Sequence, residues 1–223
     1  MSADTPYQLV RSTSSVAEFH ALPVPEPARC EIWRHDITRP ALVLGSSQDE
    51  SVVDRDACDR AGVDVVRRRS GGGAVLLLPG EVTWIDVIVP AGKAGWSDDV
   101  HRPMVWLGRH LATAIATLVD LGREVTVHEG AMRTTASSSL VCFDGVGAGE
   151  VLVDGRKLVG ISQRRTRHAA RLQCCWYSTY DPTRLVELLA PNLRPELVDL
   201  VQVATVPGAF SDVILDGLAA TLT

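Results

Sequence analysis

The dipeptide Asp154-Gly155 stands between two apolar runs, residues 149–153 and 156–162. Asp-Gly is a preferred pair for the two-residue turn that joins neighbouring antiparallel strands, because both positions need positive φ angles. The segment at 82–89, VTWIDVIV, is rich in β-branched residues and is typical of a central strand. Antiparallel pairing is therefore expected at the heart of the fold.

Helical patterns alternate with these strand signals along the chain. Apolar residues recur at helical spacing around 15–22, 53–61, 100–121, 185–189, 195–201 and 211–222, with Gly62 and Gly122 as expected stops. Residues 1–30 contain three closely spaced prolines and are otherwise expected to be irregular. Further short strands are expected at 41–45, 63–67, 125–127 and 172–178. The order predicts an α+β fold with a mixed, largely antiparallel sheet flanked by helices.

Composition narrows the class of protein. The chain has 223 residues, 46% of them hydrophobic, so residues 1–223 are expected to form a single domain. A net charge of −5 argues against general nucleic-acid binding. We see no signal peptide and no apolar stretch long enough to span a membrane. Five cysteines without a C-x-x-C pair favour neither disulfides nor a metal site, and a cytoplasmic location fits best.

The first candidate site is the run from Arg67 to Leu76, RRRSGGGAVL, in which three arginines precede a serine and three glycines. Glycine lets a ligand approach the main chain closely, and arginine suits phosphate or carboxylate oxygens. The run therefore predicts an anion-binding loop. A flexible, solvated surface loop is the alternative interpretation.

The second candidate is Lys157, in the segment GRKLVGISQ at 155–163. Strand alternation places Val159 and Ile161 on the same face as Lys157, so its ammonium is expected to be partly desolvated. Such a charge can stabilise a reacting carbonyl or phosphate. The alternative is an ordinary exposed lysine beside a turn.

The third candidate is Cys142, in the segment VCFDG at 141–145. A cysteine becomes a nucleophile where its surroundings favour the thiolate. The alternative is a small buried apolar residue, and we assign that structural role to Cys174 and Cys175 because they lie inside an apolar run.

Together these motifs resemble the lipoate–protein ligase family. The likeness rests on Arg-Arg-x-Ser-Gly-Gly-Gly-Ala-Val, on the upstream Leu44-Gly45-x-x-Gln48, and on the lysine motif that contains Gly160, and it covers roughly residues 30–180. The resemblance implies the fold shared with biotin–protein ligases. It also implies attachment of lipoate or octanoate to lysines of lipoyl-domain proteins, through an acyl-adenylate made from ATP with Mg²⁺.

The resemblance also implies roles for individual residues. Arg68 would contact the nucleotide, and Lys157 would hold the acyl carbonyl and phosphate oxygens. The rest of the loop would cradle the adenylate and acyl group through its main chain (Ser70, Gly71, Gly72, Gly73, Ala74, Val75 and Leu76). The acceptors would be glycine-cleavage H protein and the E2 subunits of 2-oxoacid dehydrogenases.

The chain departs from the ligase pattern in ways that resemble a second branch, the cysteine-dependent octanoyltransferases. Leu77-Leu78 replaces the usual His-Asp after the loop, and Glu150 stands eight residues beyond Cys142, as in that branch. There Cys142 would take octanoyl from acyl carrier protein as a thioester, without ATP or another cofactor. Both activities therefore stand as hypotheses, with the ligase as the first choice.

Two further expectations concern what accompanies the domain. The chain ends at Thr223, so no additional C-terminal domain is expected, and a separate accessory chain is a possible partner. A non-catalytic module that binds acyl groups or lipoyl domains is the third hypothesis, and it requires Lys157 and Cys142 to be idle. No membrane or nucleic-acid partner is expected.

Overall fold

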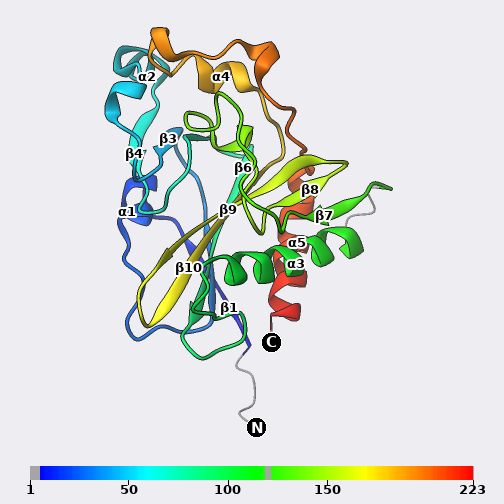
Figure 1. The fold of residues 1–223 in the computed structure, drawn as a ribbon. Coiled ribbons are helices and arrows are strands. Elements are labelled where there is room, and N and C mark those ends of the chain that lie inside the picture. The colour runs from blue at the N-terminus through cyan, green and yellow to red at the C-terminus, as the bar shows by residue number, and fades with distance from the viewer. Residues whose placement is uncertain (1–5, 119–121, 223) are drawn as a thin grey trace.

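A large mixed sheet forms the centre of the molecule (Figure 1). The structure, a computed structural model, describes residues 6–118 and 122–222. Within these residues the strand order is β1-β2-β6-β10-β9-β8-β7, and only β1 and β2 are parallel neighbours. The strands are β1 (Gln8–Ser12), β2 (Glu31–His35), β6 (Val82–Pro90), β7 (Val125–Val127), β8 (Val151–Val153), β9 (Arg156–Arg165) and β10 (Ala169–Tyr177). The expected mixed, largely antiparallel sheet is confirmed.

The turn between β8 and β9 contains Asp154 and Gly155. Their φ angles are 48° and 74°, so both residues adopt the left-handed conformation that the dipeptide predicts. The hairpin places Lys157 near the start of β9.

A second, smaller sheet has the order β4-β3-β5. Its middle strand is β3 (Ala41–Leu44), which pairs in parallel with β4 (Asp64–Arg67) and antiparallel with β5 (Val75–Leu77). Apolar side chains of this sheet share a buried cluster with those of β6 and β10, including Val43, Leu77, Trp84 and Tyr177. The small sheet therefore packs on one face of the large sheet.

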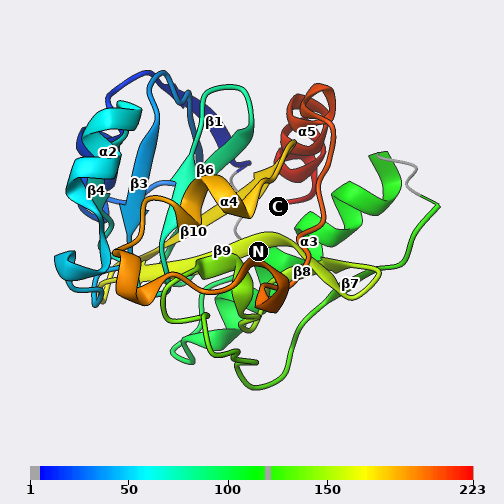
Figure 2. The same ribbon diagram turned by 90° about the horizontal axis from the view of Figure 1, so that it is seen from above.

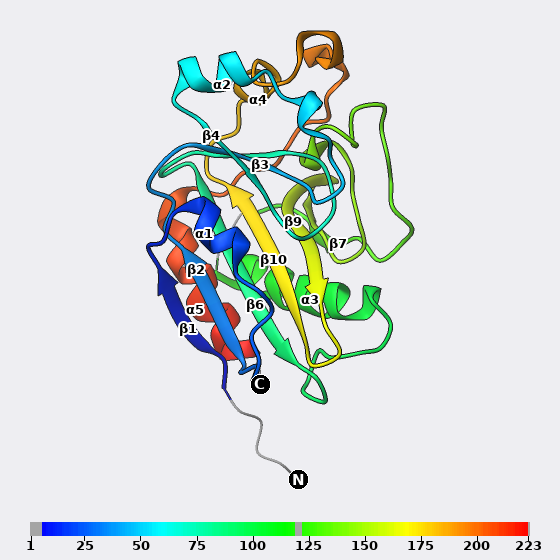
Figure 3. The same ribbon diagram turned by 90° about the vertical axis from the view of Figure 1, so that its left-hand side faces the viewer.

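Helices cover the remaining faces (Figures 2 and 3). The helices α3 (His101–Leu118) and α5 (Ser211–Thr221) lie behind the large sheet in Figure 3. Their side chains, among them Leu107 and Ile214, pack into the core on that face of the sheet. On the opposite face lies α1 (Val16–Ala21), which Ser15 starts with a capping box. The outer side of the small sheet packs against α2 (Arg55–Ala61) and α4 (Pro182–Val186). As expected, α2 ends at Gly62, at a φ of 65°.

Three segments differ from expectation or pass beyond the described chain. Residues 8–12 form β1, although 1–30 were expected to hold only a short helix. They escape sequence analysis because four of these five positions are exposed at the edge of the sheet. The helix expected at 195–201 shrinks to the short 3₁₀ turn η4 (Leu197–Asp199). The C-terminal end of the helix expected at 100–121 lies outside the described residues.

The helices also bear on the expectation about membranes. Within residues 6–118 and 122–222, no helix combines the length and the apolar character that crossing a bilayer requires.

Candidate active site

The glycine loop, residues 68–74, connects β4 to β5 across the end of β3. Its main chain is tied to the β3 end, because Arg68 N–H donates to Leu44 O at 2.9 Å and Ser46 N–H donates to Ser70 O at 2.9 Å. Gly72 has a φ of 102°, a conformation that favours glycine. A Cβ at Gly45 would overlap the carbonyl oxygen of Gly72. The Leu44-Gly45 motif therefore permits the loop to close tightly onto β3.

Arg68 lies beneath this loop, with a side chain that is almost wholly buried. Its guanidinium donates to the carbonyl oxygens of Val43 at 3.2 Å, Gly71 at 2.8 Å and Gly73 at 2.9 Å. Five donors in a rigid fork suit this task. In this structure Arg68 shapes the loop from inside rather than lining the pocket, so the geometry gives its expected contact with a nucleotide no support.

Ser70 is also buried and anchors the loop to the large sheet. Its hydroxyl donates to the side chain of Gln173 on β10 at 2.7 Å and lies 2.9 Å from the hydroxyl of Ser162 on β9. Gln173 in turn donates to Asp86, whose carboxylate pairs with Arg171. A buried polar chain thus fixes the loop above β9 and β10.

The last residues of the expected loop site have a different place. Ala74, Val75 and Leu76 contribute buried side chains to the two cores around the small sheet and do not line the pocket described below. The main chain of Ala74 instead pairs with the Cys142 segment, since it donates to Leu140 O at 2.7 Å and accepts from Cys142 N–H at 3.0 Å. This pairing brings the first and third sequence candidates together.

Gly73 and Gln48 hold the same segment from two sides. A Cβ at Gly73 would lie 2.7 Å from the main-chain nitrogen of Cys142, so only glycine fits there. The Gln48 amide donates to Ser139 O at 3.0 Å and to Leu140 O at 3.2 Å. The upstream glutamine of the motif therefore positions the residues that lead to the cysteine.

Lys157 lies below the Cys142 segment and is 3% exposed. Its ammonium donates to Cys142 O at 2.9 Å and to Gly145 O at 3.0 Å, and it pairs with the Glu150 carboxylate at 2.7 Å. Burial opposes the ammonium, but the negative charge of Glu150 and that of Cys142 in its thiolate form outweigh this effect and raise the pKa of Lys157 above its ordinary value. The lysine is therefore a fixed positive charge, not the exposed turn lysine of the alternative interpretation.

Glu150 is the residue that completes this arrangement. Besides the ion pair, its carboxylate accepts from Gly147 N–H at 2.8 Å and Ile161 N–H at 3.1 Å. Its position eight residues after Cys142 was visible in the sequence, but nothing in the pattern identified it as the partner of Lys157. Packing accounts for the glycine at position 160 of the motif, since a Cβ there would lie 3.2 Å from the ring of Phe143.

Cys142 is the most accessible of the five cysteines. It begins the 3₁₀ turn η2 (Cys142–Asp144) and is partly exposed, whereas Cys30, Cys58, Cys174 and Cys175 are buried. Burial raises the pKa of the Cys174 and Cys175 thiols, which fits their expected structural role. The Cys142 sulfur lies 3.7 Å from the position of a Cβ at Gly72, so it faces the glycine loop.

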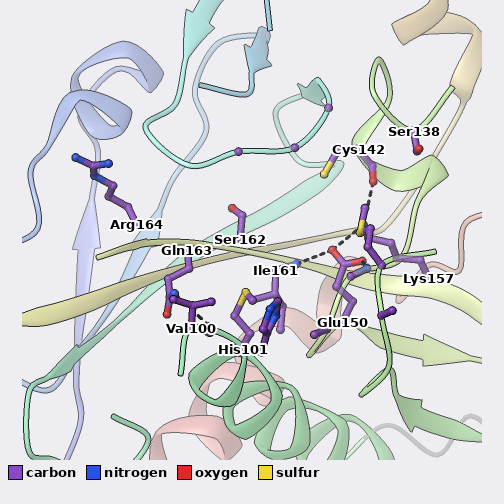
Figure 4. A pocket seen from close by; sticks show the side chains of 18 of the residues that line it. Val100, His101, Ser138, Cys142, Glu150, Lys157, Ile161, Ser162, Gln163 and Arg164 are labelled. Atoms are coloured by element: carbon purple, nitrogen blue, oxygen red, sulfur yellow. Dashed lines mark hydrogen bonds and ion pairs between the residues drawn. The ribbon is translucent and has the colours of Figure 1, made fainter. Parts of the chain in front are cut away.

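A pocket of about 810 Å³ joins these elements (Figure 4). Glu150 and Lys157 meet at one end beneath the main chain of Cys142, and Val100 and His101 come from the segment that begins α3. Its remaining walls come from the glycine loop, from 129–132, from 138 and 147–148, and from β9 (among them Arg69, Gly71, Gly72, Gly73, Met104, Glu129, Met132, Ser162, Gln163, Arg164 and Arg165). The pocket combines a thiol, a buried ammonium and glycine main chain in one cavity.

The pocket offers donors for an anion but no preformed metal site. In the part of the chain that the structure describes, the N–H groups of Gly71, Gly72 and Gly73 donate to no protein group. Three such amides can stabilise a developing negative charge on oxygen. Across the described residues no cluster of three or more His, Cys, Asp or Glu side chains has metal-binding geometry.

Proteins of similar sequence are known. The octanoyltransferase LipM of Carboxydothermus hydrogenoformans is 34% identical over 129 residues, which is 57% of this chain and 45% of that protein. The chain thus spans about half the length of this curated relative.

Two solved structures share the fold. The bi-partite lipoate protein ligase of Thermoplasma acidophilum, described with its E2 lipoyl domain, matches with a TM-score of 0.63 at 14% identity, over 97% of this chain and 81% of that chain. Lipoate-protein ligase A bound with ATP matches with a TM-score of 0.58 at 18% identity, over 96% and 82% of the two chains.

The comparison with family models covers most of the chain. The model of the lipoyl protein ligase A/B catalytic domain matches residues 23–198, a range that contains the glycine loop, Cys142 and Lys157. The chain therefore belongs to the lipoyl protein ligase A/B catalytic domain family.

Proposed function

We propose that this protein transfers an octanoyl group to the acceptor lysine of a lipoyl-domain protein through a thioester on Cys142. The observation that carries the proposal is the position of Cys142. Its thiol is the accessible one of the five and faces the glycine loop, while Lys157 holds its main chain from below. The similarity to an octanoyltransferase supports the same reading.

The first half-reaction loads the cysteine. The Cys142 thiolate attacks the carbonyl carbon of an acyl thioester, and the amides of Gly71, Gly72 and Gly73 stabilise the negative charge on the carbonyl oxygen. The bond between the carbonyl carbon and the donor sulfur then breaks, and the donor leaves as a thiol after taking up a proton. Lys157, whose three donor positions are occupied, contributes a fixed positive charge beside the thiolate.

The second half-reaction transfers the octanoyl group from Cys142 to the acceptor lysine. The neutral amine of the acceptor lysine attacks the acyl carbon on Cys142, the carbon–sulfur bond breaks, and an amide forms. The amine gives up a proton and Cys142 returns as the thiol. Acyl carrier protein as donor, and H protein or E2 lipoyl domains as acceptors, are the partners that this proposal requires.

ATP-dependent ligation, the first choice from sequence, is the second candidate. The unpaired amides of the glycine loop favour it, because they suit phosphate oxygens as well as a carbonyl oxygen. The buried guanidinium of Arg68 gives it no support, because its terminal nitrogens donate to main-chain carbonyl oxygens of Val43, Gly71 and Gly73. We therefore rank the thioester route above it.

Mass spectrometry of the intact protein tests the proposal. Octanoyl-carrier protein, without ATP, is expected to add one octanoyl group that hydroxylamine removes, and an apo lipoyl domain is expected to accept that group. Cys142→Ala should abolish both results. Product formed only with octanoate or lipoate and ATP-Mg, and retained in Cys142→Ala, would establish the ligase instead. Binding of the lipoyl domain without any product would establish the non-catalytic module.

A further inference from the structure

Three arginines line the pocket, and none has a carboxylate partner among the described residues, but Arg165 is partly buried and donates to Ser97 O at 2.9 Å. Arg69 and Arg164 are exposed, and within residues 6–118 and 122–222 neither makes an ion pair. The two carboxylates of the same pocket are already engaged, because Glu129 pairs with Arg109 at 2.7 Å and Glu150 pairs with Lys157. In a chain of net charge −5, this end of the pocket is left with uncompensated positive charge.

Arg69 and Arg164 both line the pocket near the contact between the glycine loop and β9. Arg69 immediately precedes Ser70, which contacts Ser162 on β9. Ser162 and Arg164 are two residues apart on one strand, so their side chains share a face. In Figure 4 Arg164 lies on the opposite side of the view from Cys142. The charge is therefore separated from the thiol along the length of the pocket.

The strand between these two ends has an open edge. β8 pairs with β9 only at Arg156, Lys157 and Val159, so among the described residues no strand pairs with 160–165 on that side. Ile161 N–H points away from β10, toward the Glu150 carboxylate. By strand alternation the N–H and C=O of Gln163 point the same way. From Gly160 to Arg164 the strand runs four residues, ~13 Å.

We propose that Arg69 and Arg164 form a phosphate subsite that recognises the phosphate of a pantetheine-bearing thioester donor. The proposal rests on the transfer function above and names the donor class that the same pocket selects. Such a donor has a thioester at one end, amides along its arm and a phosphate at the other end. Cys142, the free edge of β9 and the two guanidinium groups match these three features in that order.

Two small donors that differ only in the phosphate test the subsite directly. The rate at which Cys142 gains an octanoyl group is measured with octanoyl-4′-phosphopantetheine and with octanoyl-pantetheine. We expect the phosphorylated donor to react about 10-fold faster, the scale of a charge-assisted hydrogen bond. This preference is expected to shrink as ionic strength rises. Octanoyl-carrier protein and octanoyl-coenzyme A, run in parallel, distinguish the two natural sources of the arm.

The variants separate this subsite from the rest of the site. In Arg69→Gln/Arg164→Gln the ratio of the two rates should fall to about one. Arg60→Gln is the matched control, because Arg60 is an exposed arginine on α2 that does not line the pocket, and it should keep the wild-type ratio. A ratio that persists in the double variant, or that is absent in the wild type, overturns the subsite alone.

A third arm with octanoate and ATP identifies the remaining possibility. If the double variant slows only this reaction, the two arginines serve a nucleotide phosphate and the proposal is wrong. If neither thioester donor acylates wild-type Cys142, the proposed transfer function itself fails, and the subsite fails with it. The two failures therefore give different results.

Discussion

Lys157 and Cys142 are joined through main chain, because the ammonium of the lysine donates to the carbonyl oxygen of the cysteine at 2.9 Å. The link fixes the turn that carries the thiol and leaves the sulfur free of hydrogen bonds among the described residues. Lys157 thus fixes the main chain that carries the Cys142 thiol and sets the local charge. The predictions below test the parts of this arrangement separately.

Removing the charge of Lys157 is expected to cost both activity and stability. Lys157→Ala should abolish acyl transfer both from a thioester donor and from octanoate activated by ATP. Lys157→Met leaves the Glu150 carboxylate buried without its counter-ion, so the free energy of unfolding should fall by about 3–5 kcal/mol. Chemical denaturation and the transfer assay measure the two effects.

The double variant Lys157→Met/Glu150→Gln separates stability from chemistry. A neutral amide oxygen at position 150 can still accept from Ile161 N–H, so much of the lost stability should return while transfer stays absent. A fully active Lys157→Ala enzyme would contradict the proposed role of Lys157 in the site.

Gly73→Ala is expected to disturb the Cys142 segment. The new Cβ would lie 2.7 Å from both Cys142 N and Val141 C, so two main-chain segments must move apart. We expect a loss of about 1–3 kcal/mol in unfolding free energy and slower acylation of Cys142. Gly71→Ala is the matched control for stability, since its Cβ would meet nothing within 4 Å. Equal melting temperatures for the two variants would contradict the packing argument.

Gln48→Ala is expected to loosen the same segment from the other side. The substitution removes the donor to Ser139 O and Leu140 O and the acceptor of Gly45 N–H at 2.9 Å. Losing buried hydrogen bonds of this kind costs about 1–3 kcal/mol. Hydrogen exchange across residues 139–143 should speed up, and acylation should slow. The exposed Gln202→Ala should leave exchange in this segment unchanged.

His20 predicts a pH dependence of stability. Its ring is 1% exposed, and neither nitrogen has a hydrogen-bond partner in the described chain. Burial, together with the charges of Arg68 and Arg171, lowers its pKa well below 6.5. Below pH 6.5 the unfolded chain therefore binds a proton that the native protein does not bind, and stability falls as pH falls.

Equilibrium denaturation between pH 7 and pH 5 measures this effect. Each such histidine contributes a slope of up to ~1.4 kcal/mol per pH unit. Burial also lowers the pKa of His35 and His110, so His20→Leu should reduce the slope without removing it. An unchanged slope in His20→Leu would show that His20 does not cause it.

Local patterns in the sequence predicted the parts of the site that local geometry determines. The Asp154-Gly155 turn and the loop with its glycines follow from backbone preferences over a few residues. The predicted face of Lys157 was wrong, because a register shift in the β8–β9 pair breaks the alternation, so the lysine lies over the Phe143 ring beside Gly160. The proximity of Cys142 to the loop did not follow, because it depends on the pairing of Ala74 with Leu140 and Cys142.

The roles of polar residues were harder to predict than their positions. Arginine is usually exposed, so nothing local indicated that Arg68 turns inward while Arg69 faces the pocket. Ser70 depends on Gln173, which lies 103 residues away in sequence. The role proposed for Arg164 depends on the unpaired edge of β9, which the sequence of that strand does not reveal. These features come from tertiary contacts that no single segment encodes.

The main-chain attachment of Cys142 has an evolutionary consequence. The bonds from Ala74 and Lys157 reach only backbone atoms of residue 142, so the scaffold holds that position whatever side chain it carries. A substitution there can add or remove a nucleophile without rebuilding the surrounding fold. The gain or loss of a reactive side chain at this position therefore requires no change in the main-chain bonds that hold it.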